Sequence, residues 1–560
     1  MSKGNWSWIP EEAKEQWGFT VSELAAWLGV KRQVVDNWVR GRNDPDIANV
    51  IKLARLVGSI EELARRTGID IDFSPPGVLQ FNPPFQHSKH RDYENLRSIA
   101  EWMKYTSRFK ELYEQSHELL RDAAGQDKHF TAQLFFNLAY AELMLGRPQD
   151  AVRSVTKARK MLPPKKDSLL LADTHWFAGE CLRVVSKFSE AQHHLEEARK
   201  VYQRVNAKPS FRSSGPLWLE WDFGRIYAAY GQYDKAADYF LLMEKLAREN
   251  WLAEGEVIAS WSYGDIDETK SRFKAALLAY HDAEQLAGEI GDKFWEAMAL
   301  WRIAEVYRKT SAFKAALQAA EAARNIFREI GNERMVSKVD CTTAACYLMA
   351  GLYNEARGLY YNAVENFVQT GDTQMQHLSL LGLGYIRLIE ESQKTTPNFK
   401  DILPTFVDLD ARRPKSYEIY QAVTEDLALA EAFRLAGYTS HALSRYHTVE
   451  KTSARYGYQL ERAHALMGIA ATKSMKGEVD RERCIEALEI YRRLGSRWGE
   501  VQALITRTII EFGTGGNGSE YLQEASRIRQ EISLKSDREL FDTLPGIDFD
   551  TLKRYVFIFL

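Results

Sequence analysis

Residues 261–292, 301–332 and 341–372 read WSYGDIDETKSRFKAALLAYHDAEQLAGEIGD, WRIAEVYRKTSAFKAALQAAEAARNIFREIGN and CTTAACYLMAGLYNEARGLYYNAVENFVQTGD. The three stretches repeat one pattern at a spacing of 40 residues. Each contains two helical patterns of apolar residues, separated by a small residue. A period near 40 residues with two helices per unit is typical of a helical-hairpin solenoid, in which each unit buries its apolar face only against its neighbours. The sequence therefore predicts an all-α repeat array.

The same pattern continues on both sides of these three units. Each unit can be aligned on the small residue in the turn between its two helices, and most gaps between these residues are 39 or 40. The aligned turn residues are Ser107, Gly146, Ser186, Gly231, Ser271, Ser311, Gly351, Glu391, Gly437 and Gly477, with a further unit around Gly513. We predict a superhelix of about ten helical hairpins over residues 93–532, with a proline-bearing insertion near residues 392–416.

Two other segments flank the array. Residues 69–92 alternate prolines with phenylalanines, so we expect a stiff, extended linker rather than a helix. Residues 533–560 end in YVFIFL, which is far too short to cross a bilayer. Because a solenoid must protect its open end, this segment is predicted to be a C-terminal cap or a dimer contact.

Composition limits the class of protein. The 560 residues include 74 Lys and Arg against 77 Asp and Glu, a net charge of −3, which does not suggest an indiscriminate nucleic-acid binder. The four cysteines lack metal or disulfide spacing, so we expect buried thiols in a reducing compartment. With no export signal and no apolar stretch of about 18 residues, we expect a cytoplasmic protein without membrane contact. No metal site or cofactor is predicted.

Residues 1–68 contain two short helical patterns joined by a glycine turn. A capping box of Thr20 and Glu23 precedes the first, Gly29 ends it, and the second is expected to bury Trp38. Two short helices joined in this way form a helix-turn-helix. The residues predicted to face DNA are Arg32, Gln33, Asp36, Asn37, Arg40, Arg42 and Asn43. The first four are of types that bond base edges, and the others are candidates for phosphate contacts.

The run SELAAWLGVKRQVVDNWVRGRNDPD, at 22–46, resembles the helix-turn-helix of the phage-repressor (Cro/cI, or Xre) type. The resemblance implies that Arg32, Gln33 and Asn37 face the major groove, with Arg40 and Asn43 near the DNA backbone. The alternative is a small helical domain used only for dimerisation or docking.

The charge of this N-terminal segment bears on how it would bind DNA. Residues 1–68 hold ten Lys and Arg against nine Asp and Glu. Counterion release scales with the number of phosphates neutralised, so one copy would bind weakly. Useful affinity requires a homodimer that reads two half-sites.

Four tryptophans, preceded by Phe136, stand at equivalent places in consecutive units and are expected to stack along one wall. The residues four and seven positions after each tryptophan share its stripe on the helix, and most of them are charged. Since unpaired charges are rarely buried, the stripe is predicted to face the concave groove. The predicted effector-groove residues are Phe136, Trp176, Glu180, Arg183, Trp221, Arg225, Trp261, Asp265, Trp301, Glu305 and Arg308. In the alternative, the tryptophans pack between neighbouring first helices and the charges form salt bridges between repeats.

The hairpin unit resembles the tetratricopeptide repeat, lengthened from its usual period of about 34 residues. The order of parts resembles the peptide-sensing regulators of Gram-positive bacteria (the Rap, Npr, Plc and PrgX group, with arbitrium receptors), in which a signalling peptide lies in the repeat groove. The resemblance implies a DNA-binding transcription regulator whose array binds a peptide or protein effector. The alternative is a protein-interaction scaffold, for example in a defence or mobile-element locus, whose N-terminal domain docks or autoregulates. The sequence contains no catalytic motif, so we do not expect an enzyme.

Overall fold

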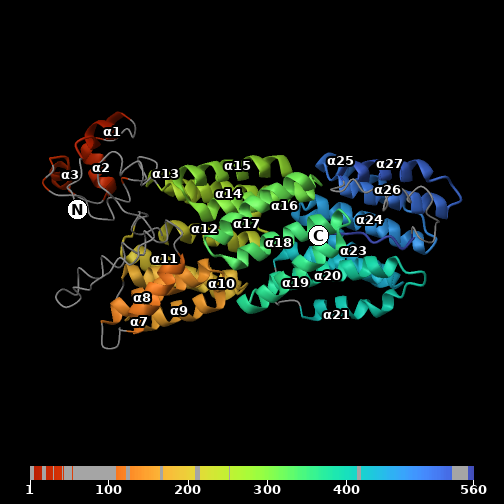
Figure 1. Ribbon diagram of the computed structural model, residues 1–560, viewed down its shortest axis with the longest axis horizontal. Helices are drawn as coiled ribbons and strands as arrows, with labels where there is room; N and C mark the ends of the chain where they lie inside the picture. The colour runs from red at the N-terminus through yellow and green to blue at the C-terminus, as the bar shows by residue number, and fades with distance from the viewer. Residues whose placement is uncertain are drawn as a thin grey trace.

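The computed structural model describes residues 6–15, 20–28, 31–40, 42, 53, 109–121, 127–163, 168–207, 215–250, 252–412, 418–532 and 553–559. Every regular element in these ranges is a helix (Figure 1). The expected linker at 69–92 and the predicted DNA contact Asn43 lie outside the described residues.

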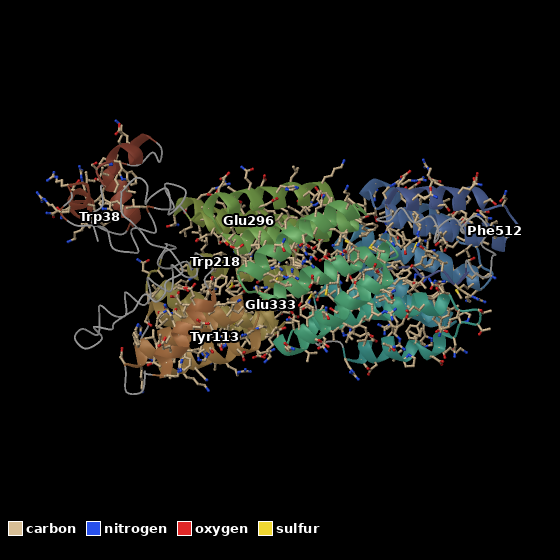
Figure 2. The ribbon with its side chains drawn as sticks, viewed as in Figure 1. Trp38, Tyr113, Trp218, Glu296, Glu333 and Phe512 are labelled. Atoms are coloured by element: carbon tan, nitrogen blue, oxygen red, sulfur yellow. The ribbon has the colours of Figure 1, made fainter. Side chains whose placement is uncertain are left out.

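Three short helices form the N-terminal domain: α1 (Ile9–Glu15), α2 (Val21–Leu28) and α3 (Arg32–Val39). Their packing depends on a few large apolar side chains. Leu24 and Val35 are fully buried, and Trp38 is 2% exposed inside this small domain (Figure 2). The alternation of buried and exposed positions along α3 is that of an amphipathic helix with one apolar stripe.

Ten consecutive helical pairs follow, preceded by the single described helix α7 (Phe109–Arg121). The first helices of the pairs are α8 (Lys128–Met144), α10 (Leu169–Val184), α12 (Gly215–Ala229), α14 (Ala253–Thr269), α16 (Lys293–Lys309), α18 (Glu333–Met349), α20 (Thr373–Ser392), α22 (Ile419–Leu435), α24 (Gln459–Met475) and α26 (Arg497–Gly513). The second helices are α9 (Pro148–Met161), α11 (Phe188–Arg204), α13 (Tyr233–Glu249), α15 (Phe273–Ile290), α17 (Phe313–Glu329), α19 (Tyr353–Thr370), α21 (Leu403–Ala411), α23 (Thr439–Tyr456), α25 (Arg481–Leu494) and α27 (Ser519–Ile532). The predicted all-α class and repeat architecture are confirmed.

The turn residues used to align the repeats have a common backbone conformation. Eight of them have positive φ, among them Gly146 at 77° and Ser271 at 59°. The residue after each turn residue donates its N–H back to a carbonyl in the last turn of the first helix, as Arg147 does to Glu142 at 2.7 Å. This bond is typical of a helix that ends in a residue with left-handed backbone conformation. Glu391 and Gly513 differ, because they lie within α20 and α26, and Ser107 lies outside the described residues.

Small residues in the first helix allow the two helices of a pair to approach closely. A Cβ added at Gly264 would lie 2.7 Å from the Tyr280 ring, and the facing Ala276 is fully buried. Tyr280 in turn is fully buried, so the glycine makes room for an aromatic core residue. The large side chain on one helix therefore requires the small one on the other.

Successive turns of the superhelix touch each other. The Ser311 hydroxyl accepts a hydrogen bond from the Trp498 backbone N–H at 2.8 Å, and the Ser271 hydroxyl accepts one from the Leu460 N–H at 3.1 Å. These contacts join residues 187 and 189 positions apart. Each serine therefore caps the N-terminus of a first helix one superhelical turn later.

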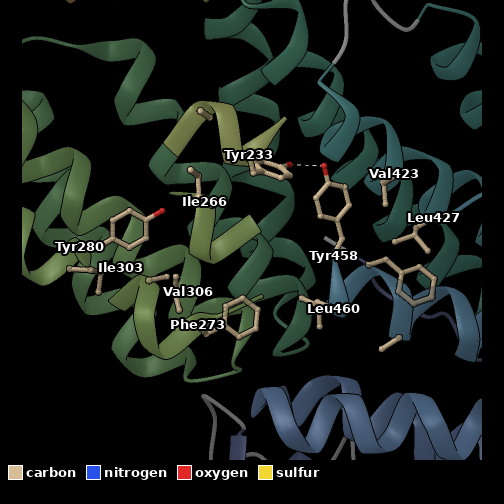
Figure 3. Close-up of a cluster of buried hydrophobic side chains, with 14 of the residues drawn as sticks. Tyr233, Ile266, Phe273, Tyr280, Ile303, Val306, Val423, Leu427, Tyr458 and Leu460 are labelled. Atoms are coloured by element: carbon tan, nitrogen blue, oxygen red, sulfur yellow. Dashed lines mark hydrogen bonds between the residues drawn. The ribbon is translucent and has the colours of Figure 1, made fainter. Parts of the chain in front are cut away.

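Aromatic residues add to this junction between turns. The hydroxyls of Tyr233 and Tyr458, two residues 225 positions apart in the sequence, lie 2.6 Å from each other (Figure 3). Both residues belong to the same apolar cluster as Phe273 and Leu460. The core of the array therefore continues from one turn of the superhelix into the next.

The predicted insertion and the C-terminus complete the array. The insertion forms a short 3-10 helix, η1 (Phe399–Asp401), and the nine-residue α21. α20 still contacts α22 directly, so the stack continues through it. Residues 555–559 are extended and packed inside the array, in contact with α22 and α26, and Tyr555 also packs against the apolar cluster of α26 and α27. That residues 533–560 form a cap or a dimer contact stays a prediction. In Figure 1 the C mark lies over the middle of the array.

Candidate functional site

The inside of the superhelix holds a cavity of about 590 Å³. Its wall is formed mainly by the first helices from α8 to α24, because these lie on the concave side of the array. All eleven predicted effector-groove residues lie on this wall: Phe136, Trp176, Glu180, Arg183, Trp221, Arg225, Trp261, Asp265, Trp301, Glu305 and Arg308. That they bind an effector stays a prediction.

The tryptophans of the wall are more buried than side chains that face only solvent in a groove. Trp176, Trp221 and Trp261 are 8%, 9% and 4% exposed, and Trp301 is half-buried. Three of the four indole N–H groups donate to the following first helix, at 2.9 Å each: Trp176 to Asp222, Trp221 to Ser262 and Trp301 to Thr342. The Trp261 N–H is buried and has no hydrogen-bond partner in the described part of the chain.

The charged residues of the stripe are paired, and several pairs join different repeats. Arg183 contacts Glu180 at 2.7 Å within α10 and Asp222 of α12 at 3.0 Å. Asp265 of α14 pairs with Arg225 of α12 and, at 2.6 Å, with Arg302 of α16. The alternative of inter-repeat salt bridges is therefore correct for these charges, and the same side chains also line the cavity.

Cations lie over the faces of the tryptophan rings. The Arg183 guanidinium carbon is 4.9 Å from the centre of Trp221, and that of Arg225 is 5.1 Å from Trp261. At this distance the negative face of an indole attracts a cation. The wall is thus a ladder of alternating aromatic and charged groups, which offers apolar surface, donors and acceptors to one ligand.

Burial changes the acidity of the groups on this wall. Burial and the neighbouring Glu180 carboxylate raise the pKa of Asp222 well above its usual range. Burial also disfavours the charged form of Glu305, but the Arg308 guanidinium outweighs this and lowers the pKa of Glu305 to about 2. The pair Glu305–Arg308 is therefore ionised at neutral pH, whereas the Glu180–Asp222 region favours retaining a proton.

The wall also holds residues that were not predicted from the sequence, among them Trp295, Arg302 and Lys338. Trp295, in the first turn of α16, has its ring centre 5.8 Å from Trp221 and 5.5 Å from Trp261. Arg302 and Lys338 also line the cavity, and burial followed by the nearby positive charge lowers the pKa of Lys338 to about 7. Trp295 and Arg302 do not fall on the aligned tryptophan stripe. Lys338 does share its helix face, because it stands three residues before Cys341, which aligns with Trp301.

The N-terminal domain presents the predicted DNA-facing side of α3 to solvent. Arg32, Gln33, Arg40 and Arg42 are exposed, whereas Asp36 and Asn37 are half-buried.

Four of the predicted DNA-facing residues form two local pairs. Arg42 donates to the Asn37 side chain at 3.3 Å, and Arg32 lies 3.8 Å from Asp36. Exposed pairs of this kind are weak, so these side chains can exchange their partners for bases or phosphates.

The described residues lack the features of two other kinds of site. Within these ranges, no three His, Cys, Asp or Glu side chains gather closely enough to hold a metal ion. Of the described helices, none is long and apolar enough to cross a membrane.

Comparison with known proteins supports the N-terminal assignment. Residues 11–63 match the helix-turn-helix family model. None of the curated proteins matches the chain.

Several solved structures resemble the array at low identity. A Rap protein complexed with the competence and sporulation factor shares 13% identity at a TM-score of 0.48, over 65% of this chain and 99% of that one. The Rap conjugation gene regulator of plasmid pLS20, in complex with the Phr* peptide, shares 11% at 0.41, over 72% and 96%. Aspartyl phosphate phosphatase F from Bacillus subtilis shares 14% at 0.38, over 66% and 96%. The chain thus joins an N-terminal helix-turn-helix domain to a helical repeat superhelix.

Proposed function

We propose that this protein is a cytoplasmic transcription regulator. Its N-terminal domain binds an operator as part of a homodimer, and the cavity of its array binds a peptide or protein effector. The observation that carries the proposal is the exposed row of Arg32, Gln33 and Arg40 on and just after α3, around the buried Val35 and Trp38. A helix that serves only packing has no need of such a row of donors, and the same donors suit base edges and phosphates.

The cavity is placed where a ligand could act on the shape of the array. Its wall includes Trp221 of α12 and Glu461 of α24, which belong to different turns of the superhelix. A ligand that contacts both turns would favour one spacing between them over another. A small change per unit adds up along the array, and in a dimer it would alter the distance between the two DNA-binding domains.

A gel-shift experiment with the region upstream of the protein's own gene tests the DNA-binding part. We expect the intact protein to bind, and Arg32→Ala combined with Gln33→Ala to abolish the sequence-specific complex. Lys14→Ala on α1 is the matched control, because it removes one exposed positive charge outside α3. Equal losses in the two variants would indicate non-specific attraction to phosphates. A failure of the intact protein to bind at low salt would favour the scaffold.

A second measurement addresses the effector. Native mass spectrometry of the purified full-length protein should detect a bound peptide, and its affinity should fall when Trp261 or Glu305 is replaced. Binding that survives both replacements would place the effector elsewhere on the molecule.

A further inference from the structure

The last described residues, 555–559, lie inside the array as an extended segment. Phe557 is fully buried, and Val556, Ile558 and Phe559 are between 2% and 6% exposed. These residues are as buried as the core of the array, although the segment belongs to none of the helical pairs.

Three fully buried polar side chains bind the main chain of this segment, which we call the C-terminal segment. Arg434 on α22 donates to the Tyr555 carbonyl at 2.6 Å, and Glu431 accepts from the Phe557 N–H at 2.8 Å. On the other edge, the Gln502 amide of α26 accepts from the Ile558 N–H at 2.7 Å and donates to the Ile558 carbonyl at 3.5 Å. The main-chain groups of alternate residues thus face α22 and α26 in turn, as they do in a strand held between two partners.

The side chains of the C-terminal segment also alternate between two surfaces. Phe557 and Phe559 belong to the apolar cluster that contains much of α24, with the Phe559 ring 4.9 Å from the ring of His464. Val556 and Ile558 belong to a second cluster, which includes much of α20. An extended apolar peptide with aromatic residues at alternate positions therefore fits this slot on both faces.

The repeat alignment connects this slot with the cavity. Glu431 and Arg434 stand six and three residues before the turn residue Gly437, which is where Glu180 and Arg183 stand before Ser186 and Glu305 and Arg308 before Ser311. All three pairs have the same contact within one helix, at 2.6, 2.7 and 2.9 Å respectively. The pair at α22 holds a peptide main chain, and the other two pairs line the cavity.

We infer that the inside of the array is a binding site for extended peptides, whose main chain is read by Glu–Arg pairs on the first helices. The chain's own C-terminal segment is the resident peptide on the pair at α22. The pairs Glu180–Arg183 and Glu305–Arg308 accept the main chain of a second, apolar peptide in the cavity. This last step rests on the proposed effector role of the cavity, whereas the binding of the C-terminal segment does not. Phe559 lies on the cavity wall, so a peptide bound there would touch the end of the resident one.

The test uses the full-length protein with a specific protease site inserted between residues 540 and 541, so that the segment is cut free only after folding. We expect the cut fragment to stay with the body of the protein in size-exclusion chromatography and to exchange with a fluorescent peptide of sequence YVFIFL bearing a lysine tag for solubility. Uncut protein should not bind this peptide at the slot between α22 and α26, because its own C-terminal segment occupies that slot. Gln502→Leu removes both amide contacts in a similar volume and should weaken peptide binding at least tenfold, while Gln285→Leu on the exposed face of α15 should not.

Immediate release of the fragment, with no binding of the fluorescent peptide by a body that keeps its helical circular dichroism spectrum, would overturn the inference. If cleavage unfolds the body, hydrogen exchange of the uncut protein decides: the Phe557 and Ile558 amides should be strongly protected, and rapid exchange there would overturn the inference as well. None of these readouts involves DNA, so they are independent of the outcome of the gel-shift experiment.

Discussion

The two neighbouring tryptophans of the cavity wall allow one sharp prediction. Trp221 and Trp261 occupy equivalent positions, both contact Trp295 edge to face, and both are at most 9% exposed. They differ in one respect: the Trp221 N–H donates to Ser262, whereas the Trp261 N–H has no partner in the described part of the chain. Replacement by phenylalanine removes the N–H in both cases and leaves a space of similar size.

Trp221→Phe loses a hydrogen bond, worth about 1 kcal/mol, whereas Trp261→Phe removes a buried donor whose desolvation costs about 1–3 kcal/mol. We therefore expect Trp221→Phe to be the less stable variant by about 2 kcal/mol. Hydrogen exchange of α12 and α14 in protein without added effector measures this difference in local opening free energy.

Effector binding should rank the two variants the other way. If effector binding opens the wall so that an acceptor reaches the buried Trp261 N–H, Trp261→Phe should weaken the binding about tenfold, since one hydrogen bond is worth about 1.4 kcal/mol at most in this setting. Trp221→Phe should bind nearly as the unmodified protein does. Equal destabilisation by both replacements would refute the reasoning, because it would mean that the Trp261 N–H is already satisfied in the protein.

Three more predictions concern the charges and turns of the array. Asp265→Asn leaves the part-buried Arg225 and Arg302 with less compensating charge and should lower the free energy of unfolding by about 3 kcal/mol in chemical denaturation. Burial disfavours ionised Asp265, but the two guanidinium groups outweigh burial and hold the pKa of Asp265 below its usual range. The stability that this carboxylate contributes is therefore present above its unfolded pKa of about 4 and is lost as pH falls through the folded pKa. The difference in stability between the unmodified protein and Asp265→Asn should accordingly shrink below about pH 4. Ser311→Ala should cost about 1 kcal/mol because it removes the cap on Trp498, whereas Ser311→Gly should be nearly neutral, since relief of the positive φ of 64° offsets the lost cap in thermal melts.

The sequence predicted those features of the fold that depend on nearby residues. The small residues at Gly146, Ser271 and Ser311 were identified as turn positions from spacing alone, and each has the positive φ that ends a helix. Gly264 is local in the same sense, because close packing against Tyr280 leaves room there for no larger side chain. Such features depend only on neighbours within about one repeat.

The sequence could not predict contacts that depend on the rotation accumulated over many repeats. The Ser311–Trp498 contact depends on the summed rotation of every unit between the two residues, and so does the arrival of Trp295 and Lys338 at one cavity. The tryptophan stripe combines the two interpretations that the sequence left open: its residues line the cavity, and they also pack and form ion pairs between repeats. The inward course of the C-terminal segment had one overlooked signal: Gln502, a polar residue that stands between the apolar Val501 and Ala503 of α26.

The serine caps between superhelical turns restrict how this array can change in length. In a simple solenoid, a unit can be duplicated or lost at any point, because each unit contacts only its neighbours. Here the turn residues Ser271 and Ser311 each meet a helix start 189 and 187 residues downstream. Insertion of one 40-residue unit between the partners would shift every such contact out of register at once. These contacts therefore depend on the number of units between the partners, and we expect tolerated length variants to be confined to the two ends of the array.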